Sequence, residues 1–281
     1  MKMLHANGAT IPALGLGTWQ LRGRTCRDMV RDALDHGYRH VDTAIMYENE
    51  VEVGEGLRAS SVARDEVFLT TKVWPDQAGD GDLQKALAGS LKRLAVDQVD
   101  LVLIHWPSPS IAFEETARAL DDAVANGMAR HVGVSNFTVA QVEEAARVSP
   151  RPIVCNQIEH HPALDQTPVR EACRANGLAV IGYCPLFRAG DLFDHPAIAG
   201  PAEAHGKSPA QIVLRWHMQQ DGCGAIPKTA TPSRMRENFA IFDFELSAAE
   251  MSAIDSLGVR QDRLCDYAFS PLWDPPVARA A

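Results

Sequence analysis

Four side chains that could together transfer a proton stand at or just after separate short apolar runs of the sequence. Asp42 lies at the end of one run and Tyr47 follows it, while Lys72 and His105 lie in or after two later runs. A free tyrosine has a pKa of about 10 and is a poor general acid near neutral pH. A neighbouring ammonium stabilises the phenolate and lowers that pKa. We therefore expect Lys72, held in place by Asp42, to lower the pKa of Tyr47.

This set of residues suits the reduction of a carbonyl group. His105 would orient the carbonyl oxygen by a hydrogen bond, and Tyr47 would protonate that oxygen as hydride arrives at carbon. The hydride has to come from a cofactor, because no side chain delivers one. Singly, each residue has an ordinary alternative: Asp42 as a helix cap, Lys72 as a surface lysine, His105 as a hydrogen-bonded core residue. Only the combination favours catalysis.

Eight short apolar runs alternate with helical patterns along the whole chain, and these elements must position the four residues. The runs are Leu14–Thr18, His40–Ala44, Phe68–Trp74, Val99–Trp106, His131–Ser135, Ile153–Glu159, Ala179–Pro185 and Gly224–Pro227. Strands that alternate with helices indicate βαβ units and a parallel sheet. Eight units predict one α/β domain over residues 1–281, a (β/α)8 TIM barrel, whose active site lies at the carboxyl ends of the strands.

Turn signals refine this fold. The stretch Met3–Ile11, with Asn7-Gly8 at its centre, predicts an N-terminal β-hairpin that covers the bottom of the barrel. Ser208-Pro209 and Thr231-Pro232 predict helix starts with an N-cap and a proline at the first helical position.

The composition limits the classes of partner. The 281 residues carry 27 basic and 36 acidic side chains, a net charge of −9, which argues against nucleic acid or an anionic membrane as partner. No apolar run approaches the ~20 residues that span a bilayer, and no signal-peptide pattern opens the chain. The six cysteines form no C-x-x-C pair and His160-His161 are adjacent, so we expect reduced thiols and no metal site. We expect a cytoplasmic monomer.

These residues and several further motifs resemble the aldo-keto reductase family over essentially the whole chain. The motifs are Gly15-Leu16-Gly17-Thr18-Trp19, Asp42-Thr43-Ala44 with Tyr47-Glu48-Asn49-Glu50, Thr71-Lys72, Ile104-His105-Trp106-Pro107, Gly133-Val134-Ser135-Asn136-Phe137, Asn156-Gln157, and Ile226-Pro227-Lys228-Thr229 through Arg234 and Glu237-Asn238. The resemblance implies an NADPH-dependent carbonyl reductase with Asp42, Tyr47, Lys72 and His105 as its catalytic tetrad. Within the family the chain is most similar to bacterial 2,5-diketo-D-gluconate and methylglyoxal reductases, which implies small ketoaldehydes or keto sugars as substrates.

The resemblance also implies a set of cofactor-binding residues. It places Ser135, Asn136 and Gln157 on the nicotinamide carboxamide, and Tyr183 stacked on the nicotinamide ring. Further cofactor contacts are expected at Gly17, Thr18, Trp19, Asp42, Cys184, Leu186, Thr229 and Ala230. Cys184 departs from the serine of many members, which we expect to weaken a contact with the pyrophosphate.

The segment from Lys228 to Arg234 runs into a predicted helix start. Such a terminus offers free N–H groups and a positive dipole to phosphate, and Lys228 and Arg234 add charges that suit an extra 2′-phosphate. The resemblance implies this phosphate site and places Glu237 and Asn238 on the adenine. The alternative for the same segment is a solvated, well-capped helix without a ligand.

Aromatic residues predict the substrate pocket. Trp19, Trp74 and Trp106 end strands on one rim, and the C-terminal stretch Arg263–Trp273 is expected to fold as a loop over the barrel mouth. The predicted pocket residues are Trp19, Tyr47, Trp74, His105, Trp106 and Trp273.

Two other functions stay open from the sequence. One is an NADPH-binding barrel with a regulatory role and little turnover. The other is a barrel hydrolase that uses Ser135 or paired carboxylates, which would bind no nicotinamide cofactor.

Overall fold

The computed structural model describes residues 1–276, and eight parallel strands form its central sheet. The strands are β3 (Leu16–Gly17), β4 (His40–Asp42), β5 (Phe68–Val73), β6 (Val99–Ile104), β7 (Ala129–Ser135), β8 (Ile153–Glu159), β9 (Ala179–Tyr183) and β10 (Cys223–Ala225). They are neighbours in chain order from β3 to β10. Each of the eight predicted runs therefore overlaps a strand. The expected single domain extends to residue 281, and its last five residues lie outside the described part.

The two edges of this sheet meet. Leu14, just before β3, forms a parallel bridge with Ala225 at the end of β10. The Gly15 N–H donates to the Ala225 carbonyl at 2.9 Å, and the Ala225 N–H donates to the Ala13 carbonyl at 2.7 Å. The sheet is thus curled on itself, and with helices outside it is consistent with the predicted (β/α)8 fold.

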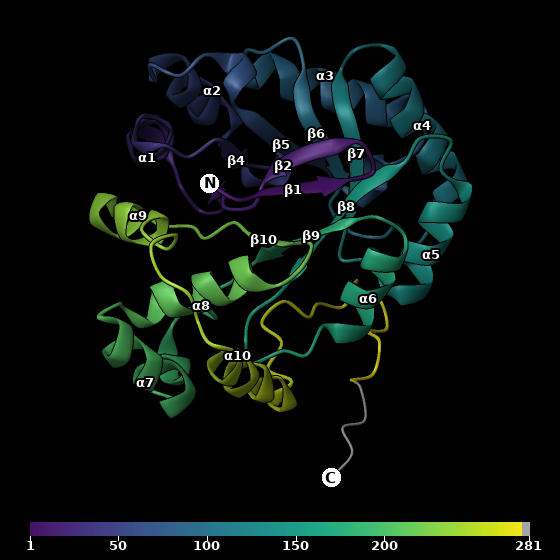
Figure 1. Cartoon of the computed structure of the whole chain (residues 1–281). Helices are drawn as coiled ribbons and strands as arrows, with labels where there is room; N and C mark the ends of the chain where they lie inside the picture. Colours follow the sequence, from purple (N-terminus) through teal and green to yellow (C-terminus); the bar gives the residue numbers. More distant parts are fainter. Residues whose placement is uncertain (277–281) are drawn as a thin grey trace.

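Helices surround the curled sheet (Figure 1). They are α1 (Gly23–His36), α2 (Glu50–Ala59), α3 (Asp82–Leu94), α4 (Phe113–Ala125), α5 (Val139–Val148), α6 (Thr167–Ala175), α7 (Pro196–His205), α8 (Pro209–Gln219), α9 (Pro232–Phe239) and α10 (Ala248–Asp255). Short 3-10 turns follow some strands or precede them, at Ile45–Tyr47, Arg64–Glu66, Pro75–Gln77, Gly190–Leu192 and Ser256–Arg260. Figure 1 shows α7 and α10 beyond α8, at the outside of the ring.

The helices face the sheet with the apolar residues that recur at helical spacing. In α1 the buried set includes Met29, Ala33 and Leu34, and in α3 it includes Leu83 and Leu87. The strands β5, β6 and β8 are buried at every residue. Side chains on one strand face then pack inside the barrel and those on the other face pack against helices, as parallel sheets require.

A two-stranded antiparallel unit precedes the barrel. β1 (Met3–Ala6) pairs with β2 (Ala9–Pro12) around Asn7 and Gly8, both of which have positive φ, as a tight two-residue turn requires. The Asn7 amide donates to the carbonyl of Ile153, the first residue of β8, at 2.8 Å. This contact places the turn at the amino ends of the strands, opposite the rim that carries the four polar residues. Figure 1 shows β1 and β2 lying across the front of the barrel strands.

Some predicted boundaries and one predicted cap are wrong. Six of the eight predicted runs overshoot, since β3, β4, β5, β6, β9 and β10 stop one or two residues before the predicted ends. Pro232 is the first residue of α9 as predicted, but the Thr231 side chain makes no cap hydrogen bond. Its backbone N–H donates to the Thr229 hydroxyl at 3.1 Å instead. Ser208 does cap α8, accepting from the Gln211 N–H.

Across the described residues, no helix is both long and apolar enough to cross a membrane. All six cysteines are unpaired, and four of them are buried.

Candidate active site

The four predicted catalytic residues meet at the carboxyl ends of three neighbouring strands. Asp42 ends β4, Lys72 lies near the end of β5, His105 follows β6, and Tyr47 lies on the 3-10 turn after β4. The Lys72 ammonium donates to Asp42 Oδ1 at 2.5 Å and to the Tyr47 hydroxyl at 3.2 Å. The ring centroids of Tyr47 and His105 lie 5.7 Å apart. The parallel register of β4, β5 and β6 therefore brings into one group residues that are far apart in sequence.

Burial and hydrogen bonding exclude two of the ordinary interpretations of these residues. The Lys72 side chain is 0% exposed and that of Asp42 is 1% exposed, so Lys72 is no surface lysine. Asp42 caps no helix: its second oxygen accepts from the Gln157 amide at 2.7 Å. The Lys72 ammonium also donates to the Thr43 carbonyl at 2.9 Å. All three ammonium hydrogens are thus directed to oxygens, which a buried charge needs.

The pKa values of this group show which protons are held. Burial by itself would lower the pKa of Lys72, but the Asp42 carboxylate and Tyr47 outweigh it and raise that pKa above its ordinary value. The predicted lowering of the Tyr47 pKa is wrong in its net direction. Burial raises the pKa of Tyr47 by more than the Lys72 ammonium lowers it. Tyr47 therefore keeps its proton at neutral pH, as a proton donor must.

His105 is neutral at neutral pH. Burial, with a smaller contribution from the Lys72 charge, lowers the pKa of His105 well below its ordinary range. Its Nδ1 atom is buried and has no hydrogen-bond partner among the described residues. A neutral imidazole has one N–H to donate, so His105 can orient a carbonyl oxygen beside Tyr47 without competing as an acid.

The residues expected on the nicotinamide form one connected network beside the tetrad. The Asn136 amide donates to the His105 carbonyl at 3.0 Å, and its oxygen accepts from the Tyr183 hydroxyl at 2.7 Å. The Ser135 hydroxyl donates to the Gln157 carbonyl at 2.8 Å. Asn136 has a φ of 64°, a conformation that asparagine tolerates and that recurs at functional sites. The network joins the ends of β6, β7, β8 and β9.

The chain after β9 carries two more predicted cofactor residues. Cys184 directly follows Tyr183 and has a positive φ of 48°. A hydrogen bond from its thiol to Cys265, together with burial, raises the pKa of Cys184. Leu186 is half-buried and packs against the barrel core. Cys184 thus contacts the C-terminal part of the chain as well as the end of β9.

The predicted phosphate residues follow β10, the strand next to β9. Lys228 and Arg234 are exposed and make no ion pair within the described chain, while Thr229 is buried and Ala230 is exposed. A Cβ on Gly17 would lie 2.6 Å from the Ile226 carbonyl oxygen, so only glycine lets the end of β3 approach this segment so closely. That approach places Gly17 beside Lys228, and Thr18 and Trp19 follow directly in the chain.

The two residues expected on the adenine have different surroundings. Glu237 accepts a hydrogen bond from the Ser208 hydroxyl, the N-cap of α8. Asn238 is 4% exposed on α9. Between residues 228 and 238 there are three basic side chains and one acidic one, a local excess of positive charge in an acidic protein.

Aromatic rings gather around the tetrad. Trp19 lies 4.9 Å from Tyr47 and Trp74 lies 5.3 Å from His105, measured between ring centroids. Trp106 is only 4% exposed, because rings of the C-terminal residues cover it, Trp273 among them at 6.1 Å. The structure thus brings the predicted pocket residues together at the rim.

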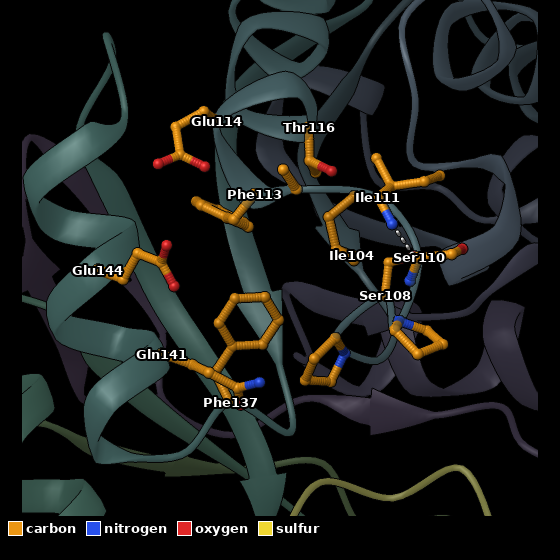
Figure 2. Close-up of a pocket in the computed structure, with 13 residues that line it drawn as sticks. Ile104, Ser108, Ser110, Ile111, Phe113, Glu114, Thr116, Phe137, Gln141 and Glu144 are labelled. Atoms are coloured by element: carbon orange, nitrogen blue, oxygen red, sulfur yellow. Dashed lines mark hydrogen bonds between the residues drawn. The ribbon is translucent and has the colours of Figure 1, made fainter.

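A separate cavity lies beside this group. It has a volume of about 360 Å³ and lies between the loop that follows β6 and the start of α5 (Figure 2). Ile104 and Pro107 line it, so it adjoins His105 and Trp106 in sequence, but its lining residues include none of the tetrad. Figure 2 shows Phe113 and Phe137 within it, with the loop residues Ser108, Ser110 and Ile111 on one side.

The sequence reasoning gave no role to two buried residues that support the tetrad. Glu50, at the start of α2, accepts from Thr71 at 2.6 Å and from Arg93 at 2.8 Å, next to Lys72 on β5. Asn49 donates to the Thr18 carbonyl at 2.8 Å and accepts from the Thr43 hydroxyl at 2.9 Å. Their position two and three residues after Tyr47 was the available signal. Both fix the segments that carry the site.

Comparison with known proteins finds one family that matches most of the chain. The model of the Aldo/keto reductase family matches residues 13–193 and 196–259. The chain is 41% identical over 255 residues to a glyoxal reductase of Bacillus subtilis, which covers 90% of this chain and 91% of that protein. A crystal structure assigned as 2,5-diketo-D-gluconic acid reductase B superposes with a TM-score of 0.93 at 42% identity, over 97% of this chain and 98% of the other. An aldo-keto reductase of Bombyx mori, solved in complex with NADP, gives a TM-score of 0.87 at 34% identity, over 94% and 95%.

Proposed function

Since the chain belongs to the aldo/keto reductase family, we propose that it reduces small aldehydes and ketones to alcohols with NADPH. It is an oxidoreductase that acts on carbonyl groups, as its family membership indicates. One observation supports the proposal most strongly. The buried Asp42–Lys72 pair lies against the hydroxyl of Tyr47, and the His105 ring lies beside it.

The chemistry of this group follows from its contacts. Tyr47 holds a proton at neutral pH and gives it to the carbonyl oxygen of the substrate. The Lys72 ammonium, 3.2 Å from the phenolic oxygen, stabilises the negative charge that this transfer leaves on Tyr47. Asp42 fixes the ammonium, and the neutral His105 donates a hydrogen bond to the carbonyl oxygen. These residues lower the barrier to protonation but supply no hydride.

A reduced nicotinamide cofactor supplies the hydride when it is bound. The residues present fit NADPH. Ser135, Asn136 and Gln157 offer amide and hydroxyl groups beside His105, and Tyr183 lies next to them. Exposed Lys228 and Arg234, without ion-pair partners in the described chain, suit the 2′-phosphate at the start of α9. The NADP complex of the Bombyx mori relative supports the same cofactor.

Small dicarbonyl compounds are the proposed substrates. The relatives that the chain resembles carry the names glyoxal reductase and 2,5-diketo-D-gluconic acid reductase, both of which describe dicarbonyl substrates. Aromatic rings around His105 and Tyr47 would hold a small, partly apolar carbonyl compound. We also propose that the protein acts as a single domain and a cytoplasmic monomer. The four proposed catalytic residues all come from one chain, so the group needs no second copy.

The hydrolase alternative finds little support. Ser135 donates its hydroxyl proton to a backbone carbonyl rather than to a base, so it is not set up as a nucleophile. The regulatory alternative differs from the proposal only in turnover.

One experiment separates the three functions. The protein is mixed with NADPH, and the absorbance of the nicotinamide band is followed with and without methylglyoxal. Oxidation of NADPH that depends on the carbonyl compound supports the reductase. A change in NADPH fluorescence without turnover of any aldehyde, ketoaldehyde or keto sugar supports the regulator. A protein that binds no NADPH contradicts both.

A further inference from the structure

A buried carboxylate outside the tetrad holds the C-terminal part of the chain. Glu159, the last residue of β8, is 0% exposed. Its Oε1 accepts from the backbone N–H of Leu264 at 2.6 Å and from His161 Nε2 at 2.8 Å. Its Oε2 accepts from the backbone N–H of Cys265 at 2.8 Å. One side chain thus satisfies two consecutive backbone groups more than 100 positions away in the sequence.

These hydrogen bonds keep the carboxylate charged in spite of its burial. Burial by itself would raise the pKa of Glu159, but the bonds from His161, Leu264 and Cys265 outweigh it and lower that pKa. A buried carboxylate needs such donors, because an unpaired charge in the interior is costly. The carboxylate and the C-terminal backbone therefore depend on each other.

The described residues 261–276, here called the C-terminal segment, contain no helix or strand. Besides the Glu159 contacts, three hydrogen bonds attach the segment to the barrel. The Asp262 N–H donates to the Ala163 carbonyl at 2.9 Å, the Val139 N–H donates to Asp274 Oδ2 at 2.9 Å, and the Cys184 thiol donates to Cys265. Between Asp266 and Trp273 its contacts with the rim are aromatic. Figure 1 shows this part of the chain, in yellow, passing between the ends of β8 and β9 and helix α10. Without a regular element, its position depends on these few contacts.

Those aromatic contacts lead directly to the tetrad. Phe269 lies 5.6 Å from Trp74 and 5.3 Å from Trp106, between ring centroids, and Trp74 lies 5.3 Å from His105. The second link runs along β8. Gln157, which holds Asp42, is two residues before Glu159 and on the same face of the strand. One strand face therefore carries a contact to the tetrad and, one step nearer the rim, a contact to the C-terminal segment.

We propose that Glu159 is a positioning residue that holds the C-terminal segment over the tetrad and thereby sets the affinity for the carbonyl substrate. The proposal rests on the reductase function proposed above. Glu159 touches no reacting atom, and its effect on the substrate passes through the backbone of Leu264 and Cys265. The step that Tyr47 performs, and the phosphate residues near Lys228, do not depend on it.

Steady-state kinetics test whether Glu159 affects the affinity for the substrate and not the catalytic step. Glu159→Ala removes both acceptors and should raise KM for methylglyoxal by at least about tenfold, since two hydrogen bonds to a charged group are lost, while kcat changes by less than about threefold. Glu159→Gln keeps one carbonyl oxygen and should give a smaller rise in KM. Glu114→Gln makes the same chemical change at an exposed position of α4 and should leave both constants unchanged. The Kd for NADPH should stay within about threefold in all three variants.

Hydrogen exchange tests the positioning without any turnover. In Glu159→Gln the amides of Leu264 and Cys265 should exchange at least about tenfold faster than in the wild type, with β5 and β6 still protected. Loss of protection throughout the barrel, or a fall in kcat as large as the rise in KM, would mean that Glu159 supports the whole fold and would overturn the proposal. An unchanged KM with unchanged exchange would overturn it as well. If the wild type reduces no carbonyl compound, the reductase function fails, and the exchange result still decides whether Glu159 holds the segment.

Discussion

The ammonium of Lys72 donates a 3.2 Å hydrogen bond to the phenolic oxygen of Tyr47, and its nitrogen lies 4.8 Å from the centre of the Tyr47 ring. The same ammonium is fixed from the other side by a buried carboxylate. Burial keeps the proton on Tyr47, and the ammonium lies where it can stabilise the phenolate that proton transfer leaves. This contact therefore suits donation of a proton during reduction. Four predictions follow from this contact and from the charges near the proposed cofactor site.

Removal of the Tyr47 hydroxyl should abolish most of the reduction. Tyr47→Phe keeps the ring next to Trp19 and His105 but has no proton to donate, so kcat for methylglyoxal should fall by about 10²–10⁴-fold. Fluorescence titration should show NADPH binding within about threefold of the wild type, since only the hydroxyl is lost.

Tyr38→Phe provides the matched control for this change. The buried Tyr38 hydroxyl donates to the Met235 carbonyl at 3.0 Å, away from the tetrad. Its loss should cost about 1 kcal/mol of unfolding free energy and leave the rate unchanged. A near wild-type rate in Tyr47→Phe would refute its role as the acid.

Removal of the Lys72 charge should affect both stability and rate. Lys72→Met leaves the Asp42 carboxylate buried with only Gln157 as a side-chain partner, and should lower the free energy of unfolding by about 3–5 kcal/mol. The double variant Asp42→Asn/Lys72→Met removes both charges and should recover part of that stability without recovering reduction. Urea unfolding followed by circular dichroism measures the first effect. A loss below about 1 kcal/mol would show that the pair is not isolated from water.

The pH dependence of the rate should reflect Tyr47 rather than His105. Burial raises the pKa of Tyr47, so the protonated form persists across neutral pH, and kcat/KM for reduction should fall only at a pH above the ordinary tyrosine value of about 10. Oxidation of the alcohol needs the phenolate and should rise with pH. The pKa of His105 lies well below its ordinary range, so neither profile should bend near pH 6.5. An inflection there in stopped-flow rates would mean that His105 titrates in the reaction.

The preference for NADPH should depend on the exposed charge at Lys228. Lys228→Ala should weaken the binding of NADPH by about 10–100-fold, which corresponds to the loss of one or two charge-assisted hydrogen bonds. The binding of NADH should change little. Lys85→Ala removes an exposed lysine from α3 and should change neither affinity. The Kd values come from fluorescence titration at fixed ionic strength. Equal losses for the two cofactors would refute contact with the 2′-phosphate.

Much of the fold could be predicted because its signals are local. Each βαβ unit has a local sequence pattern: an apolar run, a turn, and apolar residues at helical spacing. These patterns predict the positions of all eight strands. The polar residues at the ends of those runs then had to meet at one rim, since parallel strands share their direction. The sequence therefore predicts that Asp42, Lys72 and His105 lie together.

The strand boundaries and the helix cap at Thr231 were harder to predict than the strand positions. Where a strand stops depends on the point at which its neighbours cease to pair with it, and the chain at Thr18 or Trp74 looks no different locally from the strand before it. Likewise, the Thr229 hydroxyl takes the Thr231 N–H, a competition that residue type alone does not reveal.

The sequence by itself determined the strand order and the membership of the proposed catalytic group, because both depend on periodicity and on the position of polar residues along the chain. Only the tertiary structure decided the state of that group. Burial reversed the direction predicted for the Tyr47 pKa, since the cost of taking a phenolate out of water depends on what surrounds it in space. Burial also joined Glu159 to Leu264 and Cys265, a contact between distant segments that no local pattern in the sequence encodes.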